Sequence, residues 1–128
     1  AARIRNLCDA GIDGLFVSIP SPVVIPAIQN CQDLKIPVLS VNSGLDVSQN
    51  LGLLHYIGQN EFAGGYEGAK RLIAKGIKRG YCVDHEFGNG ALLERCQGFQ
   101  AAIAETNGEV VFEKYIPVPL DNQEQFIL

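Results

Sequence analysis

The chain has 128 residues, 47% of them hydrophobic, which is enough for about one domain core. Its net charge is -4 and it has no run of lysine and arginine, which argues against a dedicated nucleic-acid-binding surface. No apolar stretch approaches the roughly 20 residues that a membrane-spanning helix needs, so the composition predicts a soluble chain.

Apolar periodicity and turn residues predict helices that alternate with strands. Residues 1–10 have the pattern of the later turns of a helix that Gly11 ends. The elements expected next are a strand at 12–19, a helix at 22–34, a strand at 36–41, a turn-rich stretch at 43–50, a strand at 53–58, a helix at 61–75, a strand at 80–84, a helix at 90–105 and a strand at 109–116. This alternation predicts an α/β fold with doubly wound parallel sheets that are covered on both faces.

Two features predict that the chain is an internal segment of a longer polypeptide with two lobes. No N-cap precedes residue 1, and a further helix is expected to begin at residues 121–128 with Asp121 as its N-cap. The strand at 53–58 leads into a glycine-rich helix start at Gly64 and Gly65 rather than a conventional turn. We therefore expect residues 1–59 to be the later part of a first α/β lobe and residues 60–128 the early part of a second.

The four cysteines are Cys8, Cys31, Cys82 and Cys96, and their spacing does not match a zinc site. We interpret them as small buried hydrophobic residues. A disulfide between Cys8 and Cys31 is the alternative if the protein is exported.

Polar residues follow two neighbouring predicted strands. Asn42, Ser43 and Gly44 come after the strand at 36–41, while Gln59, Asn60 and Glu61 come after the strand at 53–58. Ligands of open α/β sheets bind just beyond the carboxyl ends of the strands. This block is therefore the predicted functional region, although Asn-Ser-Gly is also common in plain turns and Asn60 is suited to cap the next helix.

Three pieces of sequence, in this order and spacing, carry a family resemblance over essentially the whole chain: GIDGLFVSIPSP, then IPVLSVNSG followed by IGQNEFAGGYEGAKRLIAKG, then ERCQGFQAAI. They resemble the ribose-binding-protein-like sugar receptors of ABC importers, which share their fold with the effector domains of lac-repressor-type regulators. The resemblance implies two doubly wound lobes that close on a ligand about a hinge.

The resemblance also implies a set of ligand-binding residues: Ser18, Asn42, Ser43, Gln59, Glu86, Phe87, Asn89 and Arg95. Asn42 stands where the family usually has an acidic residue, and Ser43 where ribose-type members have an arginine. These two departures indicate a sugar other than ribose. Phe87 is suited to stack on the apolar face of a sugar ring, and Asn89 either caps the helix at 90–105 or contacts the ligand.

Arg95 is predicted independently of the resemblance. It lies at the edge of the apolar stripe of the helix at 90–105, and helical side chains lean toward the N-terminus. Its guanidinium is therefore expected near Asp84, His85 and Glu86, where it would offer donors to sugar oxygens. The alternative is an ion pair with Asp84 or Glu86 that ties the helix to the loop.

We therefore expect a non-catalytic receptor for a sugar or polyol, without a cofactor, that is periplasmic or extracellular and delivers its ligand to the membrane permease of an ABC importer. The alternative is the effector-binding domain of a transcription regulator or a sensor ectodomain. An enzyme is the third candidate, but the only histidines, His55 and His85, do not stand beside a recognisable nucleophile or metal-ligand pattern. His55 is interpreted as a structural residue within its strand.

Overall fold

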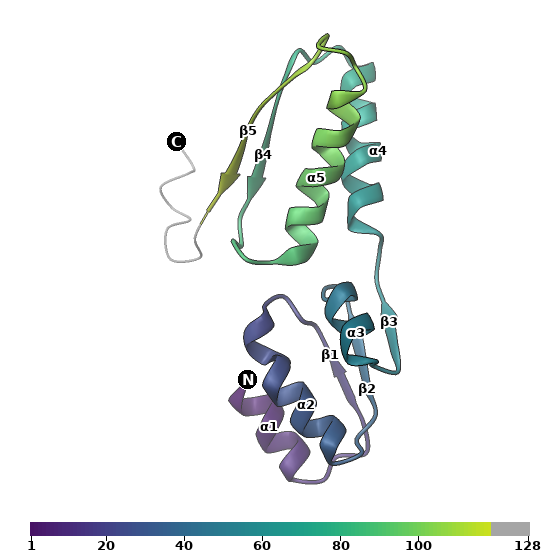
Figure 1. Cartoon of the computed structure of the whole chain (residues 1–128), viewed down its shortest axis with the longest axis vertical. Coiled ribbons are helices and arrows are strands. Elements are labelled where there is room, and N and C mark those ends of the chain that lie inside the picture. Colours follow the sequence, from purple (N-terminus) through teal and green to yellow (C-terminus); the bar gives the residue numbers. More distant parts are fainter. Residues whose placement is uncertain (119–128) are drawn as a thin grey trace. The chain divides into compact units, whose positions relative to one another are not determined.

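The structure is a computed structural model that describes residues 1–118. The chain divides into two compact units, with the boundary between Gln59 and Asn60 (Figure 1). The helix expected at 121–128 lies outside the described residues.

The first unit has a parallel sheet of three strands in the order β1-β2-β3. Leu15 pairs with Val38 in β1 and β2, and Leu39 pairs with His55 in β2 and β3. The unit contains, in chain order, α1 (Ala2–Asp9), β1 (Leu15–Val17), the 3-10 helix η1 (Pro22–Val24), α2 (Ile25–Asp33), β2 (Val38–Val41), α3 (Leu45–Leu51) and β3 (His55–Ile57).

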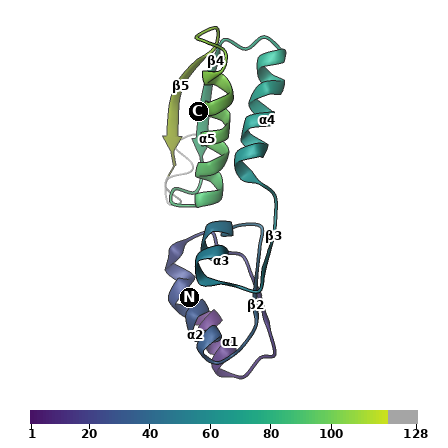
Figure 2. The ribbon, with the colours of Figure 1, turned by 45° about the vertical axis from the view of Figure 1, so that its right-hand side comes forward.

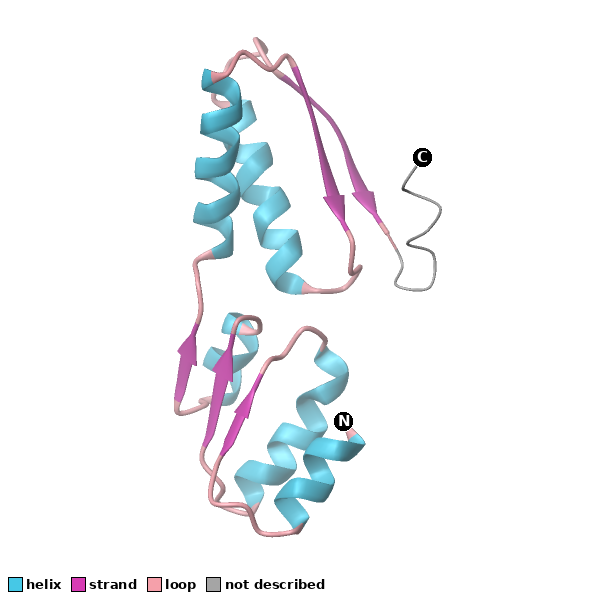
Figure 3. Ribbon diagram, turned by 180° about the vertical axis from the view of Figure 1, so that it is seen from behind, coloured by secondary structure: helices cyan, strands magenta, loops and turns pink. Residues whose placement is uncertain are grey.

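The helices of the first unit cover one face of its sheet (Figure 3). The core between them consists of apolar side chains from the helices and strands, which are Cys8, Leu15, Ile19, Ile28, Cys31, Ile36 and Val38. Phe16 and Ile57 lie on the other face, where 61% and 50% of their surfaces are exposed. Among the described residues of this unit, no helix covers that face, so the covering expected on both faces is seen on one.

The second unit has two parallel strands, β4 (Arg79–Asp84) and β5 (Val111–Pro117), and two long helices, α4 (Glu61–Ala74) and α5 (Gly90–Ala104). Helix α5 packs against α4 and against both strands, so that the helices again lie on one side of the sheet (Figure 2). Asn60 caps α4 by accepting a hydrogen bond from the Ala63 N–H at 2.8 Å, which confirms its predicted structural role.

Helices α4 and α5 touch backbone to backbone. A Cβ atom at Gly98 would lie 2.0 Å from the carbonyl oxygen of Phe62, and one at Gly65 would lie 1.9 Å from that of Arg95. Only glycine allows helices to approach this closely. Ala69 and Ala102 are also buried, so small residues line the contact on both helices.

The interpretation of the cysteines as unpaired buried residues was wrong, and the alternative of a disulfide between Cys8 and Cys31 is the one that the structure shows. Cys8 and Cys31 form a disulfide between α1 and α2, and Cys82 and Cys96 form a second one between β4 and α5. All four cysteines lie within the described residues, and each of them is in a disulfide. Burial places small sulfur-bearing residues in the core, but it does not by itself distinguish a thiol from a disulfide.

Three local expectations also differ from the structure. The turn-rich stretch at 43–50 contains helix α3, which follows Gly44. The first strand is shorter than its apolar run, because only three residues of β1 pair with β2. His55 is exposed at the start of β3 rather than held inside its strand.

Candidate functional site

The polar residues of the first unit gather at the carboxyl edge of its sheet. Ser18 follows β1, Asn42 and Ser43 follow β2, and Gln59 comes two residues after β3. The strands are parallel, so their carboxyl ends meet at one edge. The hydroxyl oxygens of Ser18 and Ser43 are 2.8 Å apart, which brings together two predicted residues that are 25 positions apart in the sequence.

Asn42 turns the chain out of β2. Its backbone has a φ of 65°, in the left-handed region that asparagine tolerates better than most residues. Its N–H donates to the Ile57 carbonyl at 2.9 Å, and its own carbonyl lies 3.1 Å from the Tyr56 hydroxyl. The backbone is thus held by β3 while the side-chain amide lies on the surface.

Ser43 differs from Asn42 because its side chain is buried. Its carbonyl accepts from the Ile19 N–H at 3.3 Å, in addition to the contact between its hydroxyl and that of Ser18. The next residue, Gly44, has a φ of 90°, and a Cβ there would lie 2.5 Å from the Cβ of Ile19. The turn after β2 is therefore packed directly against the segment after β1.

Tyr56 was not identified from the sequence. Its hydroxyl lies 3.1 Å from the carbonyl oxygen of Asn42 and 3.4 Å from that of Gln59, so it links the segments that follow β2 and β3. An aromatic residue within a strand usually indicates core packing, and nothing in the local sequence indicated this bridging position.

The carboxyl edge of the second unit is organised by Asp84, at the end of β4. Its carboxylate is 1% exposed and accepts hydrogen bonds from the Tyr115 hydroxyl at 2.5 Å and from the Glu86 N–H at 3.1 Å. Burial, together with the hydrogen bond to Asp84, raises the pKa of Tyr115 to about 12. Asp84 thereby joins β4, β5 and the loop that follows β4.

That loop carries three predicted ligand-binding residues. Asn89 donates from Nδ2 to a Glu86 carboxylate oxygen at 3.0 Å, and its Oδ1 accepts from the Ala91 N–H at 3.1 Å. The structure thus confirms the capping alternative for Asn89. Phe87 is 66% exposed between these two residues, so its ring lies on the surface.

Arg95 forms an ion pair with Glu61. The alternative that the sequence allowed for Arg95 was an ion pair with Asp84 or Glu86, and the structure shows neither of these. Its Nε donates to one carboxylate oxygen of Glu61, and its Nη2 donates to the other at 3.2 Å. This hydrogen bonding raises the pKa of Arg95 above its usual value, although partial burial opposes the shift. The prediction assumed that the Arg95 side chain leans toward the N-terminus of its helix and so toward the end of β4. In the structure, the contact of α5 with α4 places Glu61 within its reach instead.

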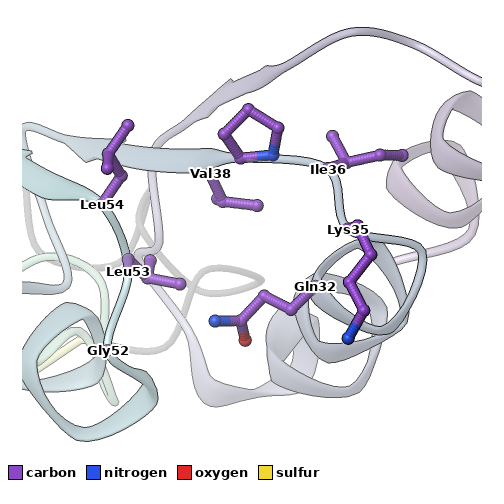
Figure 4. A pocket seen from close by; sticks show the side chains of 8 residues that line it. Gln32, Lys35, Ile36, Val38, Gly52, Leu53 and Leu54 are labelled. Atoms are coloured by element: carbon purple, nitrogen blue, oxygen red, sulfur yellow. The ribbon is translucent and has the colours of Figure 1, made fainter.

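Two hollows of the first unit lie at the opposite, amino-terminal edge of its sheet. One has a volume of about 330 Å³ and is lined mainly by apolar side chains before β2 and β3 (Figure 4). Gln32 extends into it from α2, and its amide donates to the Leu51 carbonyl at 2.9 Å. This hollow therefore lacks a set of free polar groups that would suit a sugar, and we do not place the candidate site there.

Residues 1–118 contain no cluster of three or more histidine, cysteine, aspartate or glutamate side chains that is arranged to hold a metal ion. In the same part of the chain, no helix is both long and apolar enough to span a membrane.

The model of one protein family, described as a periplasmic binding protein domain, matches residues 1–126. The chain belongs to this family. The resemblance found in the sequence is thereby confirmed, and so is the α/β fold of its parallel sheets.

Solved structures agree with this assignment. The chain is 30% identical to a carbohydrate transporter from Acidothermus cellulolyticus in complex with myo-inositol, with a TM-score of 0.79 over 97% of this chain and 41% of that one. It is 23% identical to an ABC transporter solute-binding protein from Burkholderia graminis in complex with D-arabinose, with a TM-score of 0.79 over 91% of this chain and 40% of that one.

A sugar-binding protein of an ABC transporter from Legionella pneumophila has the same fold, with a TM-score of 0.79 at 19% identity over 90% of this chain and 42% of that one. The chain described here thus spans about two fifths of the length of each of these three proteins. A search of curated proteins finds no match.

Proposed function

We propose that this chain is part of a receptor that binds a sugar or related polyol between two lobes and delivers it to the permease of an ABC importer. Residues 1–59 would be the later part of the first lobe and residues 60–128 the early part of the second. Membership of the periplasmic binding protein family is the observation that carries this proposal. The myo-inositol complex of a structure 30% identical to this chain supports a polyol as ligand.

Each unit contributes exposed groups suited to such a ligand. In the first unit, the Asn42 amide offers both a donor and an acceptor, as a hydroxyl group requires. In the second, the Arg95 guanidinium offers donors and the Phe87 ring offers an apolar face. We propose Asn42, Gln59, Phe87 and Arg95 as direct contacts, while Ser18, Ser43, Glu86 and Asn89 shape the two edges through the hydrogen bonds described above.

The two disulfides support export of the receptor to the periplasm or beyond the cell. Disulfides persist in oxidising compartments and are rare in the cytosol. They therefore favour an exported receptor over the effector domain of a cytosolic transcription regulator. A catalytic role has no comparable support, because the family model that matches the chain describes a binding protein domain.

The test is a thermal-shift screen of the full-length protein against pentoses, hexoses, inositols and sugar alcohols. A ligand present at 100 times its Kd stabilises the folded state by about 2.7 kcal/mol, which gives a clear rise in Tm. We expect one sugar or polyol to raise Tm and to be recovered unchanged after incubation. No response to any member of the panel, or conversion of the ligand to a product, would contradict the proposal.

A further inference from the structure

The Glu61–Arg95 pair stands where the two long helices of the second unit are in direct contact. Glu61 is one turn before Gly65 on α4, and Arg95 is three residues before Gly98 on α5. The carbonyl oxygen of Arg95 itself faces Gly65, as the close approach there requires. The contact between the helices therefore fixes the backbone positions from which the Glu61 and Arg95 side chains extend.

The pairing uses one side of the guanidinium and leaves the other available. Arginine has five N–H donors, and Glu61 accepts one from Nε and one from Nη2. Three N–H groups, one on Nη2 and two on Nη1, remain at the end of the side chain. Two parallel bonds to a carboxylate also fix the plane in which those three groups point.

Burial of the two partners is unequal. The Glu61 side chain is 3% exposed, whereas the Arg95 side chain is 44% exposed. The Glu61 carboxylate is thus buried, whereas part of the Arg95 side chain that it binds lies at the surface. An ordinary surface ion pair has two exposed partners, as Lys70 and Glu67 have on α4 at 53% and 61%.

We propose that Glu61 is a positioning residue that orients Arg95 so that its three remaining N–H groups face the oxygen atoms of the bound sugar or polyol. This inference rests on the proposed function. In this role Glu61 acts through Arg95: it holds the guanidinium in the orientation that the ligand requires, so that binding does not have to restrict a mobile side chain.

The experiment measures ligand affinity by calorimetry on the full-length protein, using whichever of myo-inositol, D-arabinose and D-fucose the wild type binds most tightly. Glu61→Gln is compared with wild type, and the same substitution is made in an Arg95→Lys background. Glu67→Gln is the matched control, because it removes a carboxylate from the same helix at an exposed position.

We expect Glu61→Gln to weaken binding about tenfold or more, as for a disturbed charge-assisted hydrogen bond, and to change affinity less than about twofold in the Arg95→Lys background. Glu67→Gln should leave affinity unchanged. The Arg95 Nε–H signal in NMR spectra should shift in Glu61→Gln and not in Glu67→Gln. Should Glu61→Gln fail to fold, Glu61→Asp, whose side chain is one methylene shorter, is measured in the same two backgrounds against the same criteria.

Unchanged affinity in Glu61→Gln, or an equal loss in both backgrounds, would overturn the positioning role while leaving the proposed function intact. If the wild type binds none of the three probes or any sugar of the wider panel, the proposed function fails and this role of Glu61 fails with it. A shifted Arg95 signal would then identify the pair as purely structural.

Discussion

The carboxyl edges of the two sheets both end in polar residues, but different interactions hold those residues in place. In the first unit the contacts are between neutral groups, such as the hydroxyls of Ser18 and Ser43 and the backbone of Asn42. In the second unit carboxylates organise the edge, with Asp84 bound to Tyr115 and Glu61 bound to Arg95. The first edge therefore depends on the geometry of backbone turns, and the second on charge and on the contact between helices.

Each unit also contains one disulfide, and the loss of these bonds should have the largest effect. A disulfide that closes a loop of about 15 residues stabilises a protein by roughly 3 kcal/mol. The sequence separations are 14 for Cys82–Cys96 and 23 for Cys8–Cys31. We expect Cys82→Ala with Cys96→Ala, and Cys8→Ala with Cys31→Ala, to lower the free energy of unfolding by about 3 kcal/mol each.

Urea unfolding of the full-length protein with and without a reducing agent measures this effect. Reduction should destabilise the wild type and should not affect a variant in which all four cysteines are replaced by alanine. Equal stability of the oxidised and reduced wild type would show that neither bond contributes.

The helix contact of the second unit should tolerate no added side chain. Gly98→Ala places a methyl group against the Phe62 carbonyl, so α4 and α5 must separate. We expect a loss of about 2–3 kcal/mol in the free energy of unfolding, the upper part of the range for overpacking. Gly68→Ala on α4 is the matched control, since nothing lies within 4 Å of a Cβ there.

Because alanine favours helices over glycine, Gly68→Ala should stabilise the protein by about 0.5–1 kcal/mol. Denaturant unfolding of both variants provides the comparison. If Gly98→Ala were as stable as Gly68→Ala, the backbone contact would not exist in solution.

The difference between charged and neutral edges should also appear in ligand affinity. Arg95→Ala removes charge-assisted hydrogen bonds and is expected to weaken sugar binding by about 2 kcal/mol or more. Asn42→Gly removes a neutral amide while keeping the left-handed turn, and should cost about 1 kcal/mol. Arg71→Ala, at an exposed position near the end of α4, is the control and should bind like the wild type.

Calorimetry on the full-length protein measures all three affinities. A loss for Asn42→Gly that equals or exceeds the loss for Arg95→Ala would show that the neutral edge dominates binding. Unchanged affinity in Arg95→Ala would remove Arg95 from the site.

Apolar spacing and capping residues predicted most of the fold, because each helix and strand is determined largely by a short stretch of sequence. The apolar spacing of 90–105 marks α5 to within one residue, and the capping asparagines before α4 and α5 were both recognisable. Helix α3 was missed because Asp46, Ser48 and Asn50 are typical of turns, and because the side chains that it packs on the core, Val47 and Leu51, span only one turn.

Long-range pairings could not be predicted in this way. Glu61 and Arg95 are 34 residues apart, and they meet only because two glycines bring their helices into contact. The link between Asp84 and Tyr115 depends in the same way on the pairing of β4 with β5. Cysteine pairing likewise depends on which elements become neighbours, and four cysteines allow three pairings.

The second unit should also show a dependence of its stability on pH. The pKa of Tyr115 is raised to about 12, so the folded state holds its proton more tightly than the unfolded state, in which a tyrosine has a pKa near 10. The stabilisation from this proton is complete below about pH 10 and is lost as the pH rises toward 12. Tyr115→Phe should remove this part of the alkaline loss.

Urea unfolding of wild type and Tyr115→Phe between pH 8 and pH 12 measures the difference. Tyr66, whose pKa is also raised, chiefly by its hydrogen bond to Glu105, adds to the loss in both proteins and cancels in the comparison. The free energies of unfolding should therefore differ at pH 8, where Tyr115 bonds to Asp84, and converge above about pH 10. A constant difference across this range would mean that the Tyr115 proton is not held by Asp84, and would remove one of the two carboxylate contacts that distinguish the second edge from the first.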